Sequence, residues 1–353
     1  MSLVRTSYFP EDVTILLKDI TGLVEPLPTE QREKLIQSGT HYCEMLPVEY
    51  RPSPEYLRLY EFALEGFSAE TAQAVRVMAE RIYADKQGRP VLVSLARAGI
   101  PAGIMAKHYL DKRYGINVPH YAISIIRGRG IDKNAMNYIL SRHGRESVQF
   151  VDGWTGKGAI QNQLVEAMRD YEGVDPRVAV IADPAGITPL CGTHDDFLIA
   201  SSCLNSTVSG LVSRTFLRGD IIGKDDFHGA VYYGELASED RSYEFIRRTE
   251  AHMDFSAGEV PKETAPLGTN EDVKRAAETF GVTDINLVKP GIGETTRVLL
   301  RRVPYRVLIA EECEERYVSH ILRLAEEKGV EVERFPLKHY RCCGIIKNMP
   351  SDA

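Results

Sequence analysis

The stretch that decides the fold is Val148-Gln-Phe-Val-Asp-Gly-Trp-Thr-Gly-Lys-Gly-Ala-Ile160. A short apolar run ends in one acid and is followed by a turn rich in small residues: Asp152, Gly153, Thr155, Gly156, Lys157 and Gly158. Residues 159–171 then have the composition of a helix. A buried strand, a glycine-rich turn and a helix N-terminus leave backbone N–H groups free to bind an anion. The stretch therefore predicts an α/β fold with an anion site between strand and helix.

Two common phosphate-binding loops fit this stretch poorly. A P-loop needs a glycine five residues before its Gly-Lys pair and Ser or Thr after the lysine, but Val151 and Gly158 occupy those positions. The glycines also run in the reverse of the Rossmann spacing. An ordinary strand–turn–helix junction without a ligand stays open as the alternative.

Further apolar runs on both sides of this stretch predict more strands of the same sheet. Residues 91–95 form a compact run, followed by a tight turn that carries Arg97 and a helix reaching about residue 109. The run 119–126 opens into a glycine-containing basic segment, and residues 177–183 and 197–200 are expected as later strands. Strands alternating with helices predict a parallel sheet covered on both faces, with ligands at the carboxyl ends of the strands.

The loop at 152–158 resembles the ribose-5-phosphate loop of type I phosphoribosyltransferases. The resemblance implies that Asp152 holds ribose hydroxyls and that the 5′-phosphate lies on Gly153, Thr155, Gly156, Lys157 and Gly158. It further implies a type I phosphoribosyltransferase-like parallel sheet, phosphoribosyl pyrophosphate as donor and Mg²⁺ as cofactor. Arg97 would bind pyrophosphate, and a mobile loop carrying Arg127, Arg129 and Lys133 would close over the substrate. This chain departs from the family in having Gly153 where a second acid is usual.

Composition limits the broad class of protein. The chain has 353 residues and a formal net charge of −7, which argues against indiscriminate nucleic-acid binding by the whole molecule. No apolar run of membrane-spanning length and no signal peptide are visible, so a cytoplasmic protein with reduced cysteines is expected. Residues 1–88 are interpreted as an N-terminal extension, with helices at 12–23 and 68–83 and an ordered loop at 41–54.

A Gly/Pro-rich segment at 254–269 predicts a linker, and we place the domains at 1–262 and 263–353. The second domain has helix-like segments at 271–280, 294–302 and 317–328, and strand-like ones near 286–289, 306–310, 330–335 and 344–347. It resembles the small α/β L7Ae/Pelota-like RNA-binding domain through Lys289-Pro-Gly-Ile-Gly-Glu-Thr-Thr-Arg-Val-Leu-Leu-Arg-Arg302. The predicted contacts to structured RNA are basic: Lys289, Arg297, Arg301, Arg302 and Arg306. A solvated helix face is the alternative.

The two halves together resemble phosphoribosyltransferase-like proteins with a Pelota-type tail, which occur in bacterial tellurium-resistance and stress gene neighbourhoods. Related chains are also labelled StiP-type cysteine proteases. Three thiols have a histidine close in sequence, as such a protease requires: Cys43 with His41, Cys191 with His194, and Cys342 with His339. The favoured prediction is a phosphoribosyltransferase acting on a base-like or RNA-linked acceptor. The alternatives are a non-catalytic nucleotide or phosphoribosyl sensor with an RNA-binding tail, and a cysteine protease; a homo-oligomer is left open, and no membrane partner is expected.

Overall fold

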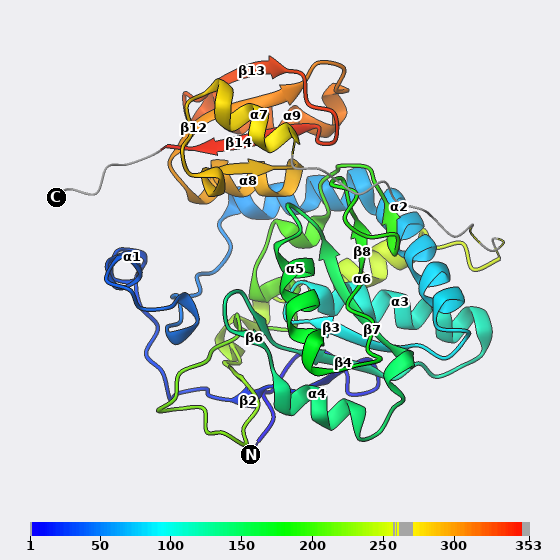
Figure 1. Ribbon diagram of the computed structural model, residues 1–353. Coiled ribbons are helices and arrows are strands. Elements are labelled where there is room, and N and C mark those ends of the chain that lie inside the picture. The colour runs from blue at the N-terminus through cyan, green and yellow to red at the C-terminus, as the bar shows by residue number, and fades with distance from the viewer. Residues whose placement is uncertain (1, 257, 259, 261–270, 348–353) are drawn as a thin grey trace.

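The computed structural model describes residues 2–256, 258, 260 and 271–347. Its centre is a six-stranded sheet with the order β1-β4-β3-β7-β8-β9 (Figure 1). Every neighbouring pair in this sheet is parallel, as predicted. The strands are β1 (Thr14–Ile15), β4 (His120–Ile123), β3 (Val91–Leu95), β7 (Val148–Trp154), β8 (Val178–Ala182) and β9 (Cys191–Thr193). Two small two-stranded sheets flank it: β2 (Lys18–Asp19) with β10 (Gly229–Ala230), and β5 (Ile125–Ile126) with β6 (Gly130–Ile131).

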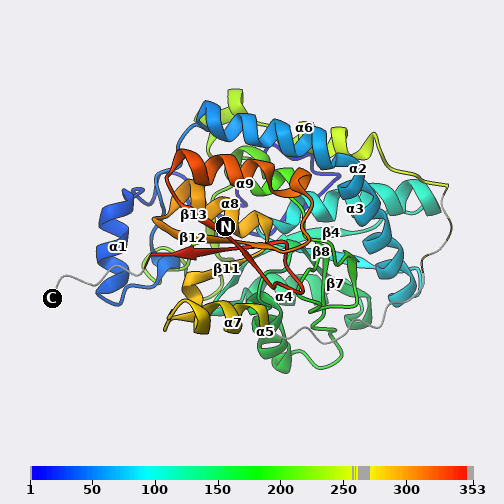
Figure 2. The same cartoon turned by 90° about the horizontal axis from the view of Figure 1, so that it is seen from above.

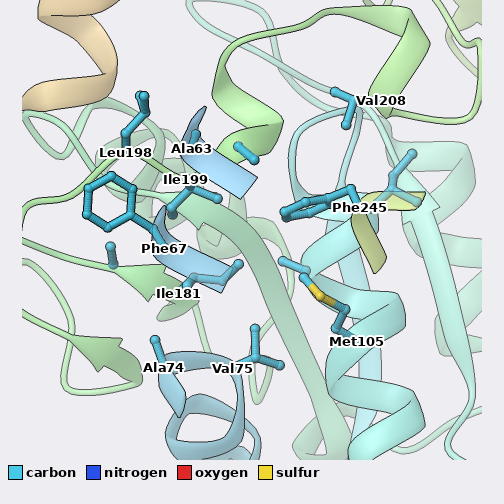
Figure 3. Close-up of a cluster of buried hydrophobic side chains, with 14 of the residues drawn as sticks. Ala63, Phe67, Ala74, Val75, Met105, Ile181, Leu198, Ile199, Val208 and Phe245 are labelled. Carbon is cyan, nitrogen blue, oxygen red and sulfur yellow. The ribbon is translucent and has the colours of Figure 1, made fainter. Parts of the chain in front are cut away.

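Helices cover both faces of the six-stranded sheet, which confirms the predicted layering. The helices α2 (Pro54–Asp85), α3 (Gly99–Tyr114) and α6 (Ser242–Glu250) pack on one face, and α4 (Lys133–Leu140) and α5 (Ala159–Ala167) on the other. The first core lies between the sheet and α2, α3 and α6, and the second core lies between the sheet and α4 and α5. Within β3, Leu92 belongs to the first core and its neighbours Val91 and Val93 to the second, because successive strand side chains point to opposite faces. Figure 3 shows Phe67 of α2, Ile181 of β8 and Ile199 gathered in the first core.

The predicted helix at 12–23 is wrong, because this segment supplies β1 and β2. Val13, Ile15 and Leu17 are buried in the core that holds α2 and α3, while Leu16 is buried in the opposite core. Alternate burial of this kind is the period of a strand and not of a helix. The first 88 residues are therefore not a mere extension, since β1 is an edge strand of the main sheet.

Three other predicted segments differ from the structure. The expected loop at 127–140 is mostly regular structure, because β5 and β6 form a hairpin and Asp132 caps α4 by accepting a hydrogen bond from the Ala135 N–H at 3.0 Å. The last strand of the sheet is β9 rather than 197–200, which runs into a 3₁₀ helix at Ala200–Ser202. Strand β7 continues through Trp154, because Asp152 and Trp154 pair with Val180 and Ala182 of β8.

The C-terminal unit contains the elements that the sequence predicts. Its four-stranded sheet has the order β11-β14-β12-β13. The helices are α7 (Glu271–Thr279), α8 (Ile292–Arg301) and α9 (Glu315–Glu327), and the strands are β11 (Val288–Pro290), β12 (Pro304–Ala310), β13 (Glu331–Phe335) and β14 (Cys342–Ile346). The proposed boundary at 262/263 and most of the expected linker lie outside the described residues.

The C-terminal unit shares a hydrophobic core with the first unit. Helix α8 lies beside α2 in Figure 1, and α9 lies alongside α2 in Figure 2. The ring of Phe67 on α2 stacks on Tyr317 of α9 with centroids 5.7 Å apart. Ile292, Leu299 and Ile321 belong to the same buried cluster as Phe67. Within the described part of the chain, no helix is both long and apolar enough to cross a membrane.

Candidate functional site

The predicted anion loop lies at the carboxyl end of β7, where the C-terminal unit covers it. The Lys157 ammonium donates to the carbonyls of Ile285 and Val288 at 2.9 and 3.1 Å, and the Tyr340 hydroxyl donates to the Gly156 carbonyl at 2.9 Å. Gly158 has a φ of +80° and precedes α5, so glycine is needed there. Part of the loop that the sequence assigns to a phosphate is therefore bonded to the tail.

Asp152 and the start of α5 line a cavity of about 270 Å³ beneath α8. The Asp152 carboxylate accepts a hydrogen bond from the Gly153 N–H at 2.8 Å. Burial raises the pKa of Asp152 to about 7, although the Gly153 N–H and the nearby Arg297 guanidinium favour the ionised form. Asp152 therefore changes charge near neutral pH.

The other residues predicted to bind the donor are held by separate partners. Arg97 donates to the Val212 carbonyl at 3.0 Å at the sheet edge, Arg129 pairs with Glu44 at 2.8 Å, and Lys133 pairs with Asp170 at 2.7 Å. The backbone N–H of Arg127 donates to the Tyr42 hydroxyl at 3.0 Å. Arg129 and Lys133 lie on the β5–β6 hairpin and at the start of α4, so the segment has regular structure. Its predicted closure over a substrate stays a prediction.

The predicted basic patch of the tail does not form one open face. Arg297 lies over the Trp154 ring at 4.9 Å, and Arg301 donates to the Asn205 side chain at 3.0 Å, so both face the first unit. Arg306 instead pairs with Glu331 and Glu333 on β13. Burial lowers the pKa of Lys289, while Arg302 borders a cavity beside α8. Four of the five side chains thus lie at or near the junction between the units, and Arg306 lies elsewhere.

A cluster of Asp183, Cys191 and His194 lies on β8 and β9: Asp183 follows β8, Cys191 begins β9 and His194 follows β9. One ligand atom from each residue lies within 4.8 Å of the others. His194 Nδ1 is 2.7 Å from the Asp183 carbonyl and 3.9 Å from its carboxylate. The Cys191 Sγ is 3.6 Å from His194 Nε2 and 3.8 Å from His194 Nδ1. Because Nδ1–H donates to a carbonyl, the lone pair of the neutral ring is on Nε2, the nitrogen nearer to the thiol.

Three neighbouring groups, from three different segments of the chain, are bonded to this cluster. Arg81 of α2 donates to the Cys191 carbonyl at 2.6 Å, and its guanidinium lies 3.7 Å from Sγ. The Thr155 hydroxyl and the Thr188 N–H donate to the buried Asp183 carboxylate. Burial raises the pKa of Asp183, and these donors together with His194 oppose that rise. A positive charge beside the thiol and a fixed imidazole are the groups that activate a cysteine nucleophile.

The other two cysteine–histidine pairs differ from this cluster in their partners. His41 Nδ1 is 3.0 Å from Cys43 Sγ and His41 Nε2 is 3.1 Å from the Arg127 carbonyl, which makes Cys43–His41 the rival pair. His41 Nδ1 also accepts the Cys43 backbone N–H at 3.3 Å as the cap of a 3₁₀ helix (Tyr42–Glu44). Burial raises the pKa of Cys43, although Arg129 and Arg214 counteract this. Cys342 is buried in β14 with its pKa raised well above the usual value, and His339 lies beside Asp272.

The Asp183–Cys191–His194 cluster has the donor set of a metal site as well. A thiolate, an imidazole and a carboxylate suit Zn²⁺, which binds such ligands at about 2.0–2.3 Å. The ligand atoms of Asp183, Cys191 and His194 lie within 4.8 Å of one another. A thiol nucleophile and its histidine base would have similar separations, so these distances fit either kind of site. Mg²⁺, which the transferase resemblance implies, prefers oxygen ligands, and its use by this chain stays a prediction.

Only part of this cluster can be predicted from the sequence. The spacing of Cys191 and His194 marks a pair of interest, but Asp183 is visible only as the residue after a strand. Arg81 lies 110 residues before Cys191, and no local pattern connects them. The clearest available signal is positional, since polar residues just after parallel strands meet at one edge of a sheet.

Comparison with known proteins finds a family match for each of the two units. Residues 6–250 match the model for the tellurite-like stress resistance cysteine protease StiP, and residues 268–348 match the PELOTA RNA binding domain. The chain is 35% identical over 364 residues to the cysteine protease StiP of Acinetobacter baylyi (strain ATCC 33305 / BD413 / ADP1). This alignment covers 97% of the present chain and 94% of the relative. No solved structure matches.

These matches correct the predicted activity. The family and the relative are both named as cysteine proteases, so the prediction of a phosphoribosyltransferase is wrong. The resemblance rests mainly on the 152–158 loop and the Arg97 turn. Lys157 of that loop donates to the tail, Thr155 donates to Asp183, and Arg97 donates to the Val212 carbonyl. A parallel sheet and a C-terminal Pelota domain are confirmed, whereas the donor and the individual ligand roles stay predictions. The chain belongs to the family of tellurite-like stress resistance cysteine proteases of the StiP type.

Proposed function

We propose that this chain is a cysteine protease in which Cys191 is the nucleophile and His194 is the general base. The observation that carries the proposal is the imidazole bridge, with His194 Nδ1 2.7 Å from the Asp183 carbonyl and Nε2 3.6 Å from Cys191 Sγ. The family name supports a cysteine-dependent hydrolase, and this geometry supplies a thiol, a base and an orienting group.

In the proposed reaction His194 first accepts and then donates a proton, and Cys191 forms and then releases a thioester. Nε2 of His194 takes the thiol proton, and Sγ of Cys191 attacks the carbonyl carbon of a peptide to form a C–S bond. The imidazolium then protonates the departing amine as the C–N bond breaks, which leaves a thioester. Water, deprotonated by His194, attacks the thioester, releases the acid and restores the thiol. Asp183 acts as a positioning residue, and Arg81 favours the thiolate.

Burial limits access to the proposed nucleophile. Cys191 is fully buried, whereas the His194 side chain is 31% exposed. A substrate therefore meets the imidazole first and reaches Sγ only after local movement. For the same reason iodoacetamide should alkylate Cys191 more slowly than Cys313, which is only partly buried.

The test compares single variants of the full chain on a library of unfolded peptides, with new N-termini detected by mass spectrometry. Cys191→Ser and His194→Ala should each lower cleavage by about 10³-fold or more, because nucleophile and base act as a unit. Cys313→Ser is the control and should cleave normally. Zn²⁺ should inhibit reversibly by occupying the same three side chains.

Cys43→Ser separates this assignment from its rival. If that variant is inactive while Cys191→Ser retains activity, the nucleophile belongs to the Cys43–His41 pair. If both variants cleave like the parent, neither thiol is the nucleophile. Far-ultraviolet circular dichroism of each variant must match the parent for these outcomes to count.

A further inference from the structure

Two adjoining cavities lie between the N-terminal segment and α8, on a different set of residues from the proposed protease site. The larger, of about 530 Å³, is lined by residues 47–53 on one side and by Arg301 and Arg302 on the other. The smaller, of about 230 Å³, continues toward Arg97 and Arg297. Leu204, Asn205 and Arg301 line both cavities, so the two form one arginine groove.

The charge of the arginine groove is strongly unbalanced. Among the described lining residues, one acid, Glu49, faces six arginines: Arg32, Arg51, Arg97, Arg297, Arg301 and Arg302. Three of the six are ion-paired: Arg51 with Glu239 at 3.0 Å, Arg297 with Glu294 at 3.2 Å, and Arg97 with Glu49 at 4.0 Å. Arg97 also donates to the Val212 carbonyl and Arg301 to the Asn205 side chain, both neutral acceptors. These three carboxylates are fewer than the six guanidiniums, so the groove keeps an excess of positive charge that favours an anionic ligand.

A half-buried arginine that interacts with two groove arginines shows that positive charges are crowded here. Arg214 donates to the Tyr42 carbonyl and is repelled by Arg32 and Arg97. Burial and the guanidiniums of Arg32 and Arg97 lower the pKa of Arg214 to about 10, although Tyr42 opposes this. An anion in the groove would relieve part of this repulsion.

The lining also offers aromatic surface beside the arginines. Tyr50 is 69% exposed, and Tyr56 carries the Arg301 guanidinium 5.5 Å from its ring centroid. Guanidiniums bind phosphates in a bidentate manner, and exposed tyrosines stack on bases. An extended groove that alternates these groups matches a strand with phosphates and bases better than an acidic peptide, which has no flat bases to stack.

We infer that the arginine groove binds a single-stranded RNA segment, with phosphates on the arginines of both walls and a base on Tyr50. The helix that forms one wall belongs to the unit that matches an RNA-binding domain, but the opposite wall comes from residues 32–56 of the first unit. The binding surface is thus composite. It requires both units and does not depend on the proposed protease activity.

The test measures binding of a fluorescein-labelled 12-nucleotide uridine RNA to the full chain by fluorescence anisotropy at 50 and 200 mM KCl. Arg51→Glu and Arg302→Glu, on opposite walls, should each raise Kd at least fivefold and reduce the salt dependence. Tyr50→Ala should raise Kd by about 5- to 100-fold, as loss of one stacked base does. Cys191→Ser should bind like the parent, which separates this inference from the protease proposal.

Two control variants match these changes in chemistry. Arg323→Glu alters an exposed arginine on α9, and Tyr305→Ala removes a tyrosine that is 45% exposed on β12; both should leave Kd within twofold. The inference fails if the parent shows no binding at 50 mM KCl or if the groove variants behave like these controls. It also fails if poly-glutamate of equal charge displaces the RNA as well as unlabelled RNA does, because the groove would then serve an acidic protein.

Discussion

The pKa of the Asp152 carboxylate depends on the segment that packs over it. The end of β7 and the overlying α8 leave Asp152 half-buried beside a cavity, and its desolvation there raises its pKa to about 7. A carboxyl group with a raised pKa stabilises the fold fully below its unfolded value near 4, and this contribution is lost as the pH rises through 7. At pH 8 the native protein therefore holds an unfavourable charge at this position.

Replacement of Asp152 by Asn should stabilise the protein in alkaline solution. The amide removes the charge, so we expect the free energy of unfolding at pH 8 to rise by about 1–2 kcal/mol after allowance for solvent screening. The difference from the parent should shrink toward zero near pH 4. Urea unfolding at both pH values checks this, and an equal effect at pH 4 and pH 8 would contradict it.

Residue roles proved harder to predict than residue positions. Thr155 and Lys157 do lie in a turn between strand and helix, but the hydroxyl serves Asp183 and the ammonium serves the tail. The composition of a loop shows which hydrogen-bonding side chains it contains. It does not show which distant segment of the chain will bond to them. Cys191 and His194 were visible as a pair, whereas Asp183 and Arg81 join them only through the fold.

Among the elements, α3 packs on the sheet more closely than a side chain would allow. A Cβ added at Gly103 would lie 2.1 Å from the Ser94 Oγ and 2.3 Å from the His120 Nε2, both of which belong to the buried sheet. Ser94 and His120 are hydrogen-bonded at 2.7 Å across β3 and β4. Glycine therefore sets the distance between α3 and these strands.

Gly103→Ala should destabilise the protein by roughly 2–4 kcal/mol, because helix and sheet must separate or the Ser94–His120 contact must break. Gly66→Ala is the matched control, since Gly66 lies in α2 with no atom within 4 Å of an added Cβ. There alanine should stabilise by up to about 1 kcal/mol through helix propensity. Thermal unfolding of both variants is the measurement, and equal midpoints would refute the argument.

The elements divide into those that the sequence specifies locally and those that it does not. The strands of the main sheet at 91–95 and 178–182, and all elements of the tail, follow from continuous apolar runs or helical periodicity. The segment 12–23 was misassigned because its apolar residues are buried on both sides, which hides the alternation. The edge strand β9 has only three residues, too few to show a period.

At the scale of the whole molecule, the two units share one core and should unfold together. Trp154 is the single tryptophan of the chain and lies against Arg297 of the tail, so its emission reports the junction between the units. In urea, the Trp154 emission and the far-ultraviolet circular dichroism should change with the same midpoint. An earlier transition in the emission alone would show that the tail detaches first.

Arg297→Ala provides a control for that experiment. It removes the guanidinium over the indole, so the native emission should change while the midpoint from circular dichroism falls by only a small amount. Arg323→Ala on the outer side of α9 should leave the native emission as it is. If Arg297→Ala leaves the emission unchanged, Trp154 does not report this contact.

The stacking of Phe67 on Tyr317 also sets an order of events on the ribosome. These residues are 250 positions apart, so a nascent chain elongating at about 5–20 residues per second presents Phe67 without its partner for roughly 10–50 s. During that interval the face of α2 that will receive α9 is an open apolar surface. A chaperone that shields this face of α2 co-translationally would act before the tail is made. Premature termination between residue 250 and the start of α9 at Glu315 would leave this face permanently uncovered.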